Sequence, residues 1–319
     1  MKGIFKPAIP SAAVKIIIIM SAVVLLPQCN SREFHEMVFQ YMKSRNDALA
    51  VDLKGRQDGY IHILRTLANI MADYENIPAG ERLDRYDEIL LAVFNSEPEI
   101  AALFTVWKPD AVGGTDSNYR ARPGSNPSGP QPIDGQVRMN IVTNADIDIA
   151  MGYLYGPDSK KDHVDDPVPG RLNGRDTYLI RMSVPIVNRR TNEAAGIVSC
   201  LLSIDAIQIF LESAMRDYAE IAAMTVYSNN GFIMGSYVPD RVGKHMIDVD
   251  TIYGDYIWDA EQAVIKGQDF YCFSYSLILS TYMEIFITPF QIGNSDTTWS
   301  VMNAATEYFF KRRSFLNFR

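Results

Sequence analysis

The stretch that decides the fold runs from residue 178 to residue 211 and reads YLIRMSVPIVNRRTNEAAGIVSCLLSIDAIQIFL. Two apolar, β-branched segments, 178–187 and 194–204, are joined by the polar connection NRRTNEA, which predicts a hairpin of two central strands. Asp205 follows directly and is expected to act as the N-cap of a helix. The apolar face of that helix is predicted to be Ile207, Phe210, Leu211 and Met215.

Upstream of this hairpin, the sequence predicts a long helix. Apolar residues recur at three- and four-residue steps between 31 and 76, which is the period of an amphipathic helix. At about 1.5 Å per residue such a helix reaches nearly 70 Å, longer than a compact domain is wide. A second helix should end at the sequence NSEP, and EIAALFTVW then reads as a strand.

Residues 108–136 change in character. They are rich in Pro, Gly, Ser, Asn and Asp, which predicts a loop. A loop of this length is unusual inside a compact domain, so it is either functional or a tolerated surface insertion.

Downstream of residue 206, a similar order of predicted strands and helices recurs. AMTVYSNNGFIMGSY predicts two strands around an Asn-Gly turn, and YIWDAEQAVIKG predicts a short helix that ends at a glycine. DFYCFSYSL, TYMEIFITPFQI and TTWSVMNAA predict three more strands. Antiparallel hairpins with helices set to one side indicate the α+β class. We divide the chain into a signal anchor or signal peptide (1–30), a stalk helix (31–76), two α/β modules (77–206 and 207–306) and a tail (307–319).

The N-terminus is typical of a targeting segment. Lys2, Lys6 and Lys15 precede the apolar run 16–26, which is short for a membrane span of about 17–25 residues. A positive flank with a short apolar run indicates export, by a cleaved signal or a signal anchor. Cys29 lies just after the run, where lipoproteins are modified, so a lipid-anchored form stays open. We therefore expect an extracytoplasmic domain at the inner membrane.

Composition excludes several classes of protein. The 319 residues carry a net charge of −8 with no long basic run, so we expect no nucleic-acid partner. No P-loop, dinucleotide-binding, zinc-protease or hydrolase motif is found, so we expect neither an enzyme nor a cofactor.

Cys200 and Cys272 lie in apolar runs and are predicted to be buried free thiols. The acidic sequence KKDHVDDP around His163 is interpreted as a charged surface loop, with a cation site as the alternative.

Aromatic and polar residues gather around the predicted loop. Arg181 lies in an otherwise apolar strand, where a charge must face solvent, pair with an acid or line a polar cavity. A pocket with aromatic walls and a few convergent polar groups suits a small ligand. For each residue alone, core packing or surface pairing is the simpler interpretation, but the group as a whole favours a binding site. The candidate ligand-binding residues are Trp107, Tyr119, Arg138, Tyr153, Tyr155 and Arg181.

The order of these segments resembles the double Cache sensor domain of methyl-accepting chemotaxis proteins. FTVWKPDAVGGTDSNYR is similar to that family's strand and following loop, and residues 178–208 resemble its pair of central strands. NNGFIMGSYVPDRVGKHM resembles the hairpin of the membrane-proximal module, and TTWSVMNAA its closing strand. The resemblance covers about residues 33 to 306.

The resemblance implies a long N-terminal helix followed by two PAS-like Cache modules, each an antiparallel sheet with flanking helices. It implies a small-molecule ligand in the membrane-distal module (77–206), a homodimer formed through the long helix, and a membrane anchor at the N-terminus. Two features depart from the family pattern. The Trp-Tyr pair and downstream Asp of the amino-acid-binding members have no match in SGPQPIDGQVRMN and DDPVPGRLNGRD.

The second departure concerns the C-terminus. No apolar run of about 18 residues follows residue 306, as a second membrane span would require. We therefore expect either a chemoreceptor-type sensing domain without its output part or a stand-alone exported or lipid-anchored binding protein. An exported enzyme that uses Asp165 and Asp166 is a third alternative.

Overall fold

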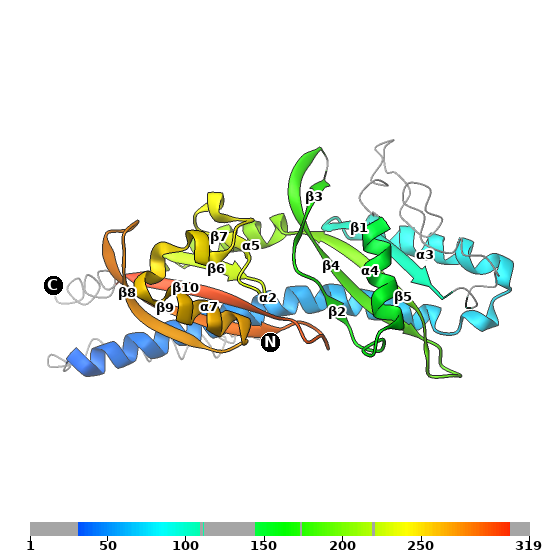
Figure 1. The fold of residues 1–319 in the computed structure, drawn as a ribbon, viewed down its shortest axis with the longest axis horizontal. Coiled ribbons are helices and arrows are strands. Elements are labelled where there is room, and N and C mark those ends of the chain that lie inside the picture. The colour runs from blue at the N-terminus through cyan, green and yellow to red at the C-terminus, as the bar shows by residue number, and fades with distance from the viewer. Residues whose placement is uncertain (1–30, 109–110, 112–143, 173, 219–220, 307–319) are drawn as a thin grey trace, which may run out of the picture.

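The computed structural model describes residues 31–108, 111, 144–172, 174–218 and 221–306. Two five-stranded antiparallel sheets lie side by side along one long helix, and the molecule is elongated along that helix (Figure 1). The predicted α+β class and the arrangement of a long helix with two sheet modules are confirmed. The signal segment 1–30, the tail 307–319, Tyr119 and Arg138 lie outside the described residues.

The long helix α2 spans Ser31–Met71 and packs against strands of both sheets. It ends five residues before the predicted end at residue 76. A turn at Ala72 and Asp73 leads into the short 3₁₀ helix η1 (Tyr74–Asn76), and Pro78 follows shortly after. Because proline disfavours a helical conformation in the residue before it, Ile77 is extended, and the chain returns through η2 (Ala79–Glu81) and α3.

The first sheet has the strand order β1-β5-β4-β2, with β3 also paired to β4. The hairpin predicted from residues 178–204 is confirmed as its centre, with Val184 opposite Val198. The predicted helix and strand before the long loop are confirmed as α3 and β1. The elements are α3 (Arg82–Ser96), β1 (Ile100–Trp107), α4 (Asn144–Tyr155), β2 (His163–Val164), β3 (Val168–Leu172), β4 (Arg175–Val187) and β5 (Ala194–Ser203).

The second sheet has the order β7-β6-β10-β9-β8, and all five of its strands were predicted. Gly231 in the β6–β7 turn and Gly267 after α7 have positive φ, as the Asn-Gly turn and the helix stop require. Its elements are α5 (Asp205–Asp217), β6 (Ala223–Tyr227), β7 (Ile233–Ser236), η4 (Pro239–Arg241), α6 (Met246–Val249), η5 (Thr251–Tyr256), α7 (Ile257–Ile265), β8 (Phe270–Ser276), β9 (Thr281–Gln291) and β10 (Thr298–Thr306).

The start of α5 corrects one prediction. Ile204 occupies the N-cap position, and Asp205 is the first helical residue, with no side-chain capping bond. The Asp205 carboxylate instead accepts a hydrogen bond from the Thr177 hydroxyl at 3.2 Å. The strand β5 runs into the helix without the extended residue that a side-chain cap needs, because Ile204 is already helical (φ −65°, ψ −12°).

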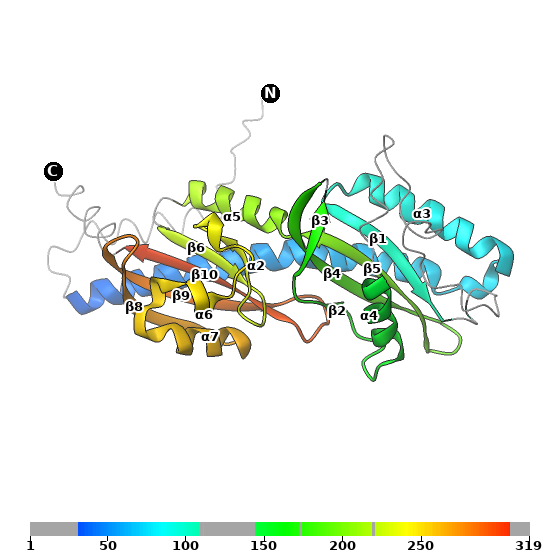
Figure 2. The same cartoon turned by 45° about the horizontal axis from the view of Figure 1, so that its top comes forward.

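The hydrophobic core is continuous along α2. One cluster of buried residues lies between the two sheets and the helices α2, α3 and α5. Figure 2 shows where these three helices lie relative to the sheets. Smaller clusters lie under α4 in the first module and under α6, η5 and α7 in the second. The predicted burial of Cys200 and Cys272 as free thiols is confirmed. Among the described residues, no helix has the length and apolar character needed to cross a bilayer.

Candidate ligand-binding site

A buried ion cluster lies on the first sheet under α4. Side chains of β4 alternate, so Ile180 and Met182 join the core beneath α2, while Leu179 packs under α4 and Arg181 points to the same side as Leu179. The Arg181 guanidinium donates to Asp146 Oδ1 of α4 at 2.6 Å and to Asp165 Oδ2 at 2.6 Å. Arg181 is only 4% exposed. Two carboxylates therefore share one guanidinium in a nearly closed space.

Tyr153 and His163 close one side of this cluster. The Tyr153 hydroxyl donates to Asp165 Oδ1, and its ring stacks on the His163 ring with centroids 3.9 Å apart. Burial, and then the charge and hydrogen bond of Asp165, raise the pKa of Tyr153. Burial lowers the pKa of His163, whose Nε2 has no hydrogen-bond partner among the described residues. The stacked pair is therefore neutral at pH 7.

The segment around His163 corrects the prediction of a charged surface loop. We call residues 162–166 the β2 segment. Asp162 is buried, and its Oδ2 accepts from Arg65 of α2 and from the Asn294 backbone N–H at 2.7 Å. The Val164 carbonyl accepts from the Thr297 hydroxyl at 2.8 Å. Asp166 accepts from the Asn230 amide at 2.9 Å. The acids are used in specific contacts because β2 pairs with β4 at the junction of the two sheets.

The structure brings only some of the predicted site residues together. Tyr153 and Arg181 belong to the ion cluster. Tyr155 is 59% exposed at the end of α4, and the Lys108 ammonium lies 5.3 Å from its ring centroid. Trp107 points to the opposite face of the sheet, where its ring stacks on Tyr86 with centroids 5.5 Å apart. The expected grouping of Trp107 with Arg181 is therefore wrong, because β1 directs alternate side chains to the two faces.

Sequence reasoning missed the two acids that hold Arg181. An arginine in an apolar strand signals that a partner is needed, but Asp146 and Asp165 are 35 and 16 residues away. No local pattern connects them. The helix α4 was itself not predicted, because its sequence is apolar over much of its surface and lies close after the segment 108–136 predicted as a loop. Only the packing of α4 onto the sheet shows which carboxylates reach Arg181.

The second module contains a comparable buried pair. Arg241 Nη1 donates to Asp250 Oδ1 at 2.6 Å, and the Tyr227 hydroxyl donates to Asp250 Oδ2 at 2.5 Å. The Tyr227 and Tyr253 hydroxyls lie 2.9 Å apart. Burial raises the pKa of Asp250, against the opposing effect of Tyr227 and Arg241. One carboxylate here faces one guanidinium, so the network is neutral overall.

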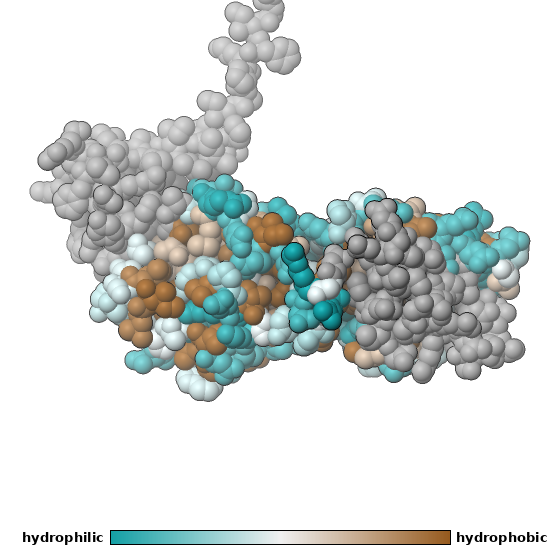
Figure 3. All heavy atoms as spheres, turned by 90° about the horizontal axis from the view of Figure 1, so that it is seen from above, coloured by the Kyte–Doolittle hydropathy of each residue, from teal (hydrophilic) through white to brown (hydrophobic). Residues whose placement is uncertain are grey.

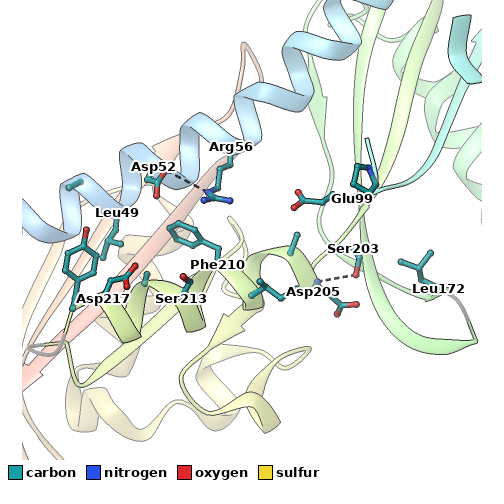
Figure 4. Close-up of a pocket in the computed structure, with 16 residues that line it drawn as sticks. Leu49, Asp52, Arg56, Glu99, Leu172, Ser203, Asp205, Phe210, Ser213 and Asp217 are labelled. Atoms are coloured by element: carbon teal, nitrogen blue, oxygen red, sulfur yellow. Dashed lines mark hydrogen bonds and ion pairs between the residues drawn. The ribbon is translucent and has the colours of Figure 1, made fainter. Parts of the chain in front are cut away.

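A groove of about 500 Å³ lies between α2, α5 and the start of β1 (Figure 4). Its polar lining consists mainly of Asp52, Glu99, Asp205 and Asp217, with Arg56 as the one basic residue. The Arg56 guanidinium lies 4.7 Å from the Phe210 ring centroid and 3.8 Å from Asp52. This volume falls within the range of small-ligand sites, and the surplus of carboxylates favours a cation. No group of three metal-ligating side chains exists among the described residues.

Comparison with solved structures shows the fold. The extracellular domain named for the histidine kinase mmHK1S-Z2 is 20% identical, with a TM-score of 0.64 over 85% of this chain and 98% of that one. The periplasmic sensory domain of the Campylobacter jejuni chemoreceptor Tlp1 is 15% identical, with a TM-score of 0.57 over 85% and 98%. The ligand-binding domain of the Pseudomonas aeruginosa amino acid chemoreceptor PctB, in complex with L-Arg, is 16% identical, with a TM-score of 0.53 over 86% and 97%.

No protein-family model and no curated protein matches the sequence. The solved structures nevertheless cover most of the chain and nearly all of their own length. The fold expected from the resemblance to double Cache sensor domains is therefore confirmed. These similar structures are the extracellular domain of a histidine kinase, the periplasmic sensory domain of a chemoreceptor and the ligand-binding domain of an amino acid chemoreceptor.

Proposed function

We propose that this chain is the extracytoplasmic sensing domain of a chemoreceptor-type signal transducer, with a small-molecule ligand bound in the first module (77–206). The fold supports the sensing role, and the ion cluster supports the site. Arg181, almost completely buried between Asp146 and Asp165, is the observation that carries the proposal. Buried charges are costly and groups with shifted pKa values gather at functional sites, so this cluster is the favoured place for a ligand.

The proposed contacts come from α4, β4 and the preceding loop. Tyr153, Tyr155 and Arg181 are the described members, and Tyr119 and Arg138 remain predicted members from the loop. Trp107 has a different role in this proposal, because it holds β1 against α3 on the far face of the sheet. A ligand that carries an ammonium group has the carboxylates of Asp146 and Asp165 as hydrogen-bond acceptors in this cluster. The amino acids bound by domains such as PctB are one class of this kind.

The β2 segment offers a route from the site to the second module. Asp165 contacts Arg181 and Tyr153, while its neighbours Asp162, Val164 and Asp166 bond to α2 and to the turns of the second sheet. A ligand that displaces Asp165 would therefore change the contacts of both α2 and the second sheet. Such a ligand acts only through different affinities for the two arrangements.

We also propose that α2 forms a parallel homodimer. Small or short side chains follow one exposed stripe of α2 at three- and four-residue spacing: Ser44, Ala48, Val51, Gly55 and Gly59. A Cβ added at Gly55 or Gly59 would meet nothing within 4 Å. Small residues let two helix backbones approach closely. Sedimentation equilibrium should show a dimer that Gly55→Glu dissociates, with Asp84→Asn on α3 as an exposed control.

The ligand is tested by thermal shift on the chain, with amino acids, organic acids, sugars, polyamines and nucleobases. A ligand at 100 times its dissociation constant stabilises by about 2.7 kcal/mol, which corresponds to several degrees. Arg181→Ala is unsuitable because it leaves two buried carboxylates unpaired and lowers the melting temperature by itself. The informative variants are Tyr153→Phe, Tyr155→Ala and, in the groove, Asp217→Asn.

Loss of the shift in Tyr153→Phe and Tyr155→Ala, with Asp217→Asn and the exposed control Tyr256→Phe unaffected, supports the first-module site. Loss of the shift in Asp217→Asn alone places the ligand in the groove and contradicts that site.

The alternative function, a stand-alone exported or lipid-anchored binding protein, is distinguished by mass spectrometry of the mature N-terminus. An acyl group on Cys29 favours the alternative.

A further inference from the structure

The turn between β8 and β9 exposes an unusual number of large apolar side chains. We call residues 271–282 the apolar hairpin. Its exposed members are Tyr271, Phe273, Tyr275, Leu277, Ile278, Leu279 and Tyr282, with Leu277 72% exposed. Elsewhere in the described chain, such side chains are exposed at scattered positions. Figure 3 shows hydrophobic spheres gathered over the second module. Contiguous exposed apolar surface marks a contact with a partner or a membrane.

The apolar hairpin reverses the usual alternation of a surface strand. In β8, Ser274 and Ser276 are buried, while Tyr271, Phe273 and Tyr275 point outward. A strand with one solvated face normally directs its polar residues to water. No Asp, Glu, Lys or Arg occurs between Asp269 and Glu284. On the same face, Glu284 lies opposite Phe273 but is only 4% exposed, so the exposed part of this face presents no charged side chain from residues 270–284.

Ring contacts hold the outward side chains in place. The Phe273 and Tyr282 rings are stacked, with centroids 5.2 Å apart, and Tyr275 packs edge-on against Tyr282 at 5.1 Å. The next residues along the turn, Leu277, Ile278 and Leu279, are all aliphatic. The aliphatic tip is therefore backed by a fixed group of aromatic rings, the order of side chains found where proteins meet a bilayer surface.

The position of the hairpin indicates which partner covers it. Its turn lies at the end of the molecule where α2 begins and β10 ends (Figures 1 and 2). The apolar run 16–26 ends five residues before Ser31, the first residue of α2. At no more than about 3.6 Å per residue, those five steps span at most about 18 Å. Lys311, Arg312 and Arg313 follow shortly after the end of β10 in the sequence.

We propose that the apolar hairpin inserts its Leu277-Ile278-Leu279 tip into the outer surface of the lipid bilayer, with the tyrosine rings at headgroup level. The inference rests on the proposed extracytoplasmic sensing role and on the expectation from the sequence that segment 16–26 anchors the chain in the membrane. It adds a second point of attachment, which would orient α2 relative to the membrane. Tyrosine prefers the headgroup level because its ring is apolar and its hydroxyl is polar.

The test is depth-dependent fluorescence quenching on the full chain in phosphatidylcholine vesicles. A cysteine at 278 (Ile278→Cys, in a Cys29→Ser background) carries the fluorophore, since Cys200 and Cys272 are buried. Ile70→Cys is the matched control, because Ile70 is 50% exposed near the opposite end of α2. Lipids spin-labelled near the headgroup should quench the probe at 278 at least threefold more than the probe at 70. Changing Leu277 and Leu279 to serine should remove that difference.

Flotation of the same vesicles tests the membrane anchoring of the chain separately from the insertion of the apolar hairpin. If the chain does not float, the anchoring fails. If it floats and the probe at 278 is quenched no more than the probe at 70, the hairpin proposal is wrong. A probe at 278 that iodide cannot reach even without lipid would mean that protein covers the hairpin, either a second copy or residues 307–319, and would also overturn it.

Discussion

Among the described residues, each module buries one arginine, and the two modules pair it in different ways. Arg181 is shared by Asp146 and Asp165, which come from α4 and from the β2 segment. Arg241 pairs with one carboxylate, that of Asp250 nine residues along the chain, and the hydroxyls of Tyr227, Tyr237 and Tyr253 complete that network. The first cluster therefore joins α4, β4 and the β2 segment through two carboxylates on one guanidinium. The second is neutral and local, which is the pattern of a structural support.

This difference agrees with the proposed division of the fold into a ligand-binding first module and a supporting second module. A neutral, fully bonded network gains nothing from a ligand, and any change in it leaves a buried charge unpaired. A cluster with one extra carboxylate retains an ion pair when one acid is withdrawn. The first module can therefore rearrange at a lower cost in free energy than the second.

The largest expected effect comes from Asp250→Asn. The substitution leaves the Arg241 guanidinium, almost completely buried, without a counter-charge. Breaking a buried pair in this way typically costs about 3–5 kcal/mol. Urea unfolding followed by circular dichroism measures the loss, with the exposed Asp240→Asn as control. A loss below about 1 kcal/mol would remove the contrast between the two modules.

A smaller loss is expected for Tyr227→Phe. The hydroxyl donates to Asp250 and contacts the Tyr253 hydroxyl, in a fully buried position. A hydrogen bond to a charged group contributes about 1.5–3 kcal/mol. Tyr256→Phe, an exposed tyrosine of the same module, serves as the control. Equal stability of the two variants would show that the network does not depend on this bond.

Asp146→Asn should cost less still, about 1 kcal/mol. Arg181 keeps its ion pair with Asp165, and the new amide oxygen can still accept the hydrogen bond from Arg181. The free energy of unfolding is compared with that of Asp176→Asn, whose side chain is 96% exposed. A cost as large as that of Asp250→Asn would mean that both clusters are structural.

The smallest effect concerns pH. Because burial lowers the pKa of His163, the folded state favours the neutral imidazole. The neutral His163 side chain contributes fully to stability above the pKa of about 6.5 that it has in the unfolded chain. This contribution is lost as pH falls through the lower pKa that His163 has in the folded state. His163→Gln should therefore flatten the fall in the free energy of unfolding between pH 7.5 and pH 5.5. The exposed His62→Gln should leave the fall unchanged, and the same fall in both variants would contradict the prediction.

Much of the fold could be predicted because the signals are local. The alternation of apolar residues in 178–204 and the Asn230-Gly231 turn each specify a hairpin without reference to distant residues. The helix α4 and the strands β2 and β3 were missed because they follow the long loop and depend on the sheet for their pairing. Of the candidate site residues, Arg181 and Tyr153 both contact Asp165, while Trp107 belongs to the other face of the sheet; their role in ligand binding stays a prediction.

By itself the sequence determined the α+β class, the long helix and the need of Arg181 for a partner. Periodicity and a charge inside an apolar strand are properties of neighbouring residues. Only the tertiary structure decided that Asp146 and Asp165 are the partners, that Trp107 turns away from them, and that the aromatic rather than the serine side of β8 faces outward. These outcomes depend on which face of each sheet a helix covers, because a strand directs its side chains equally to both faces until something packs against one of them.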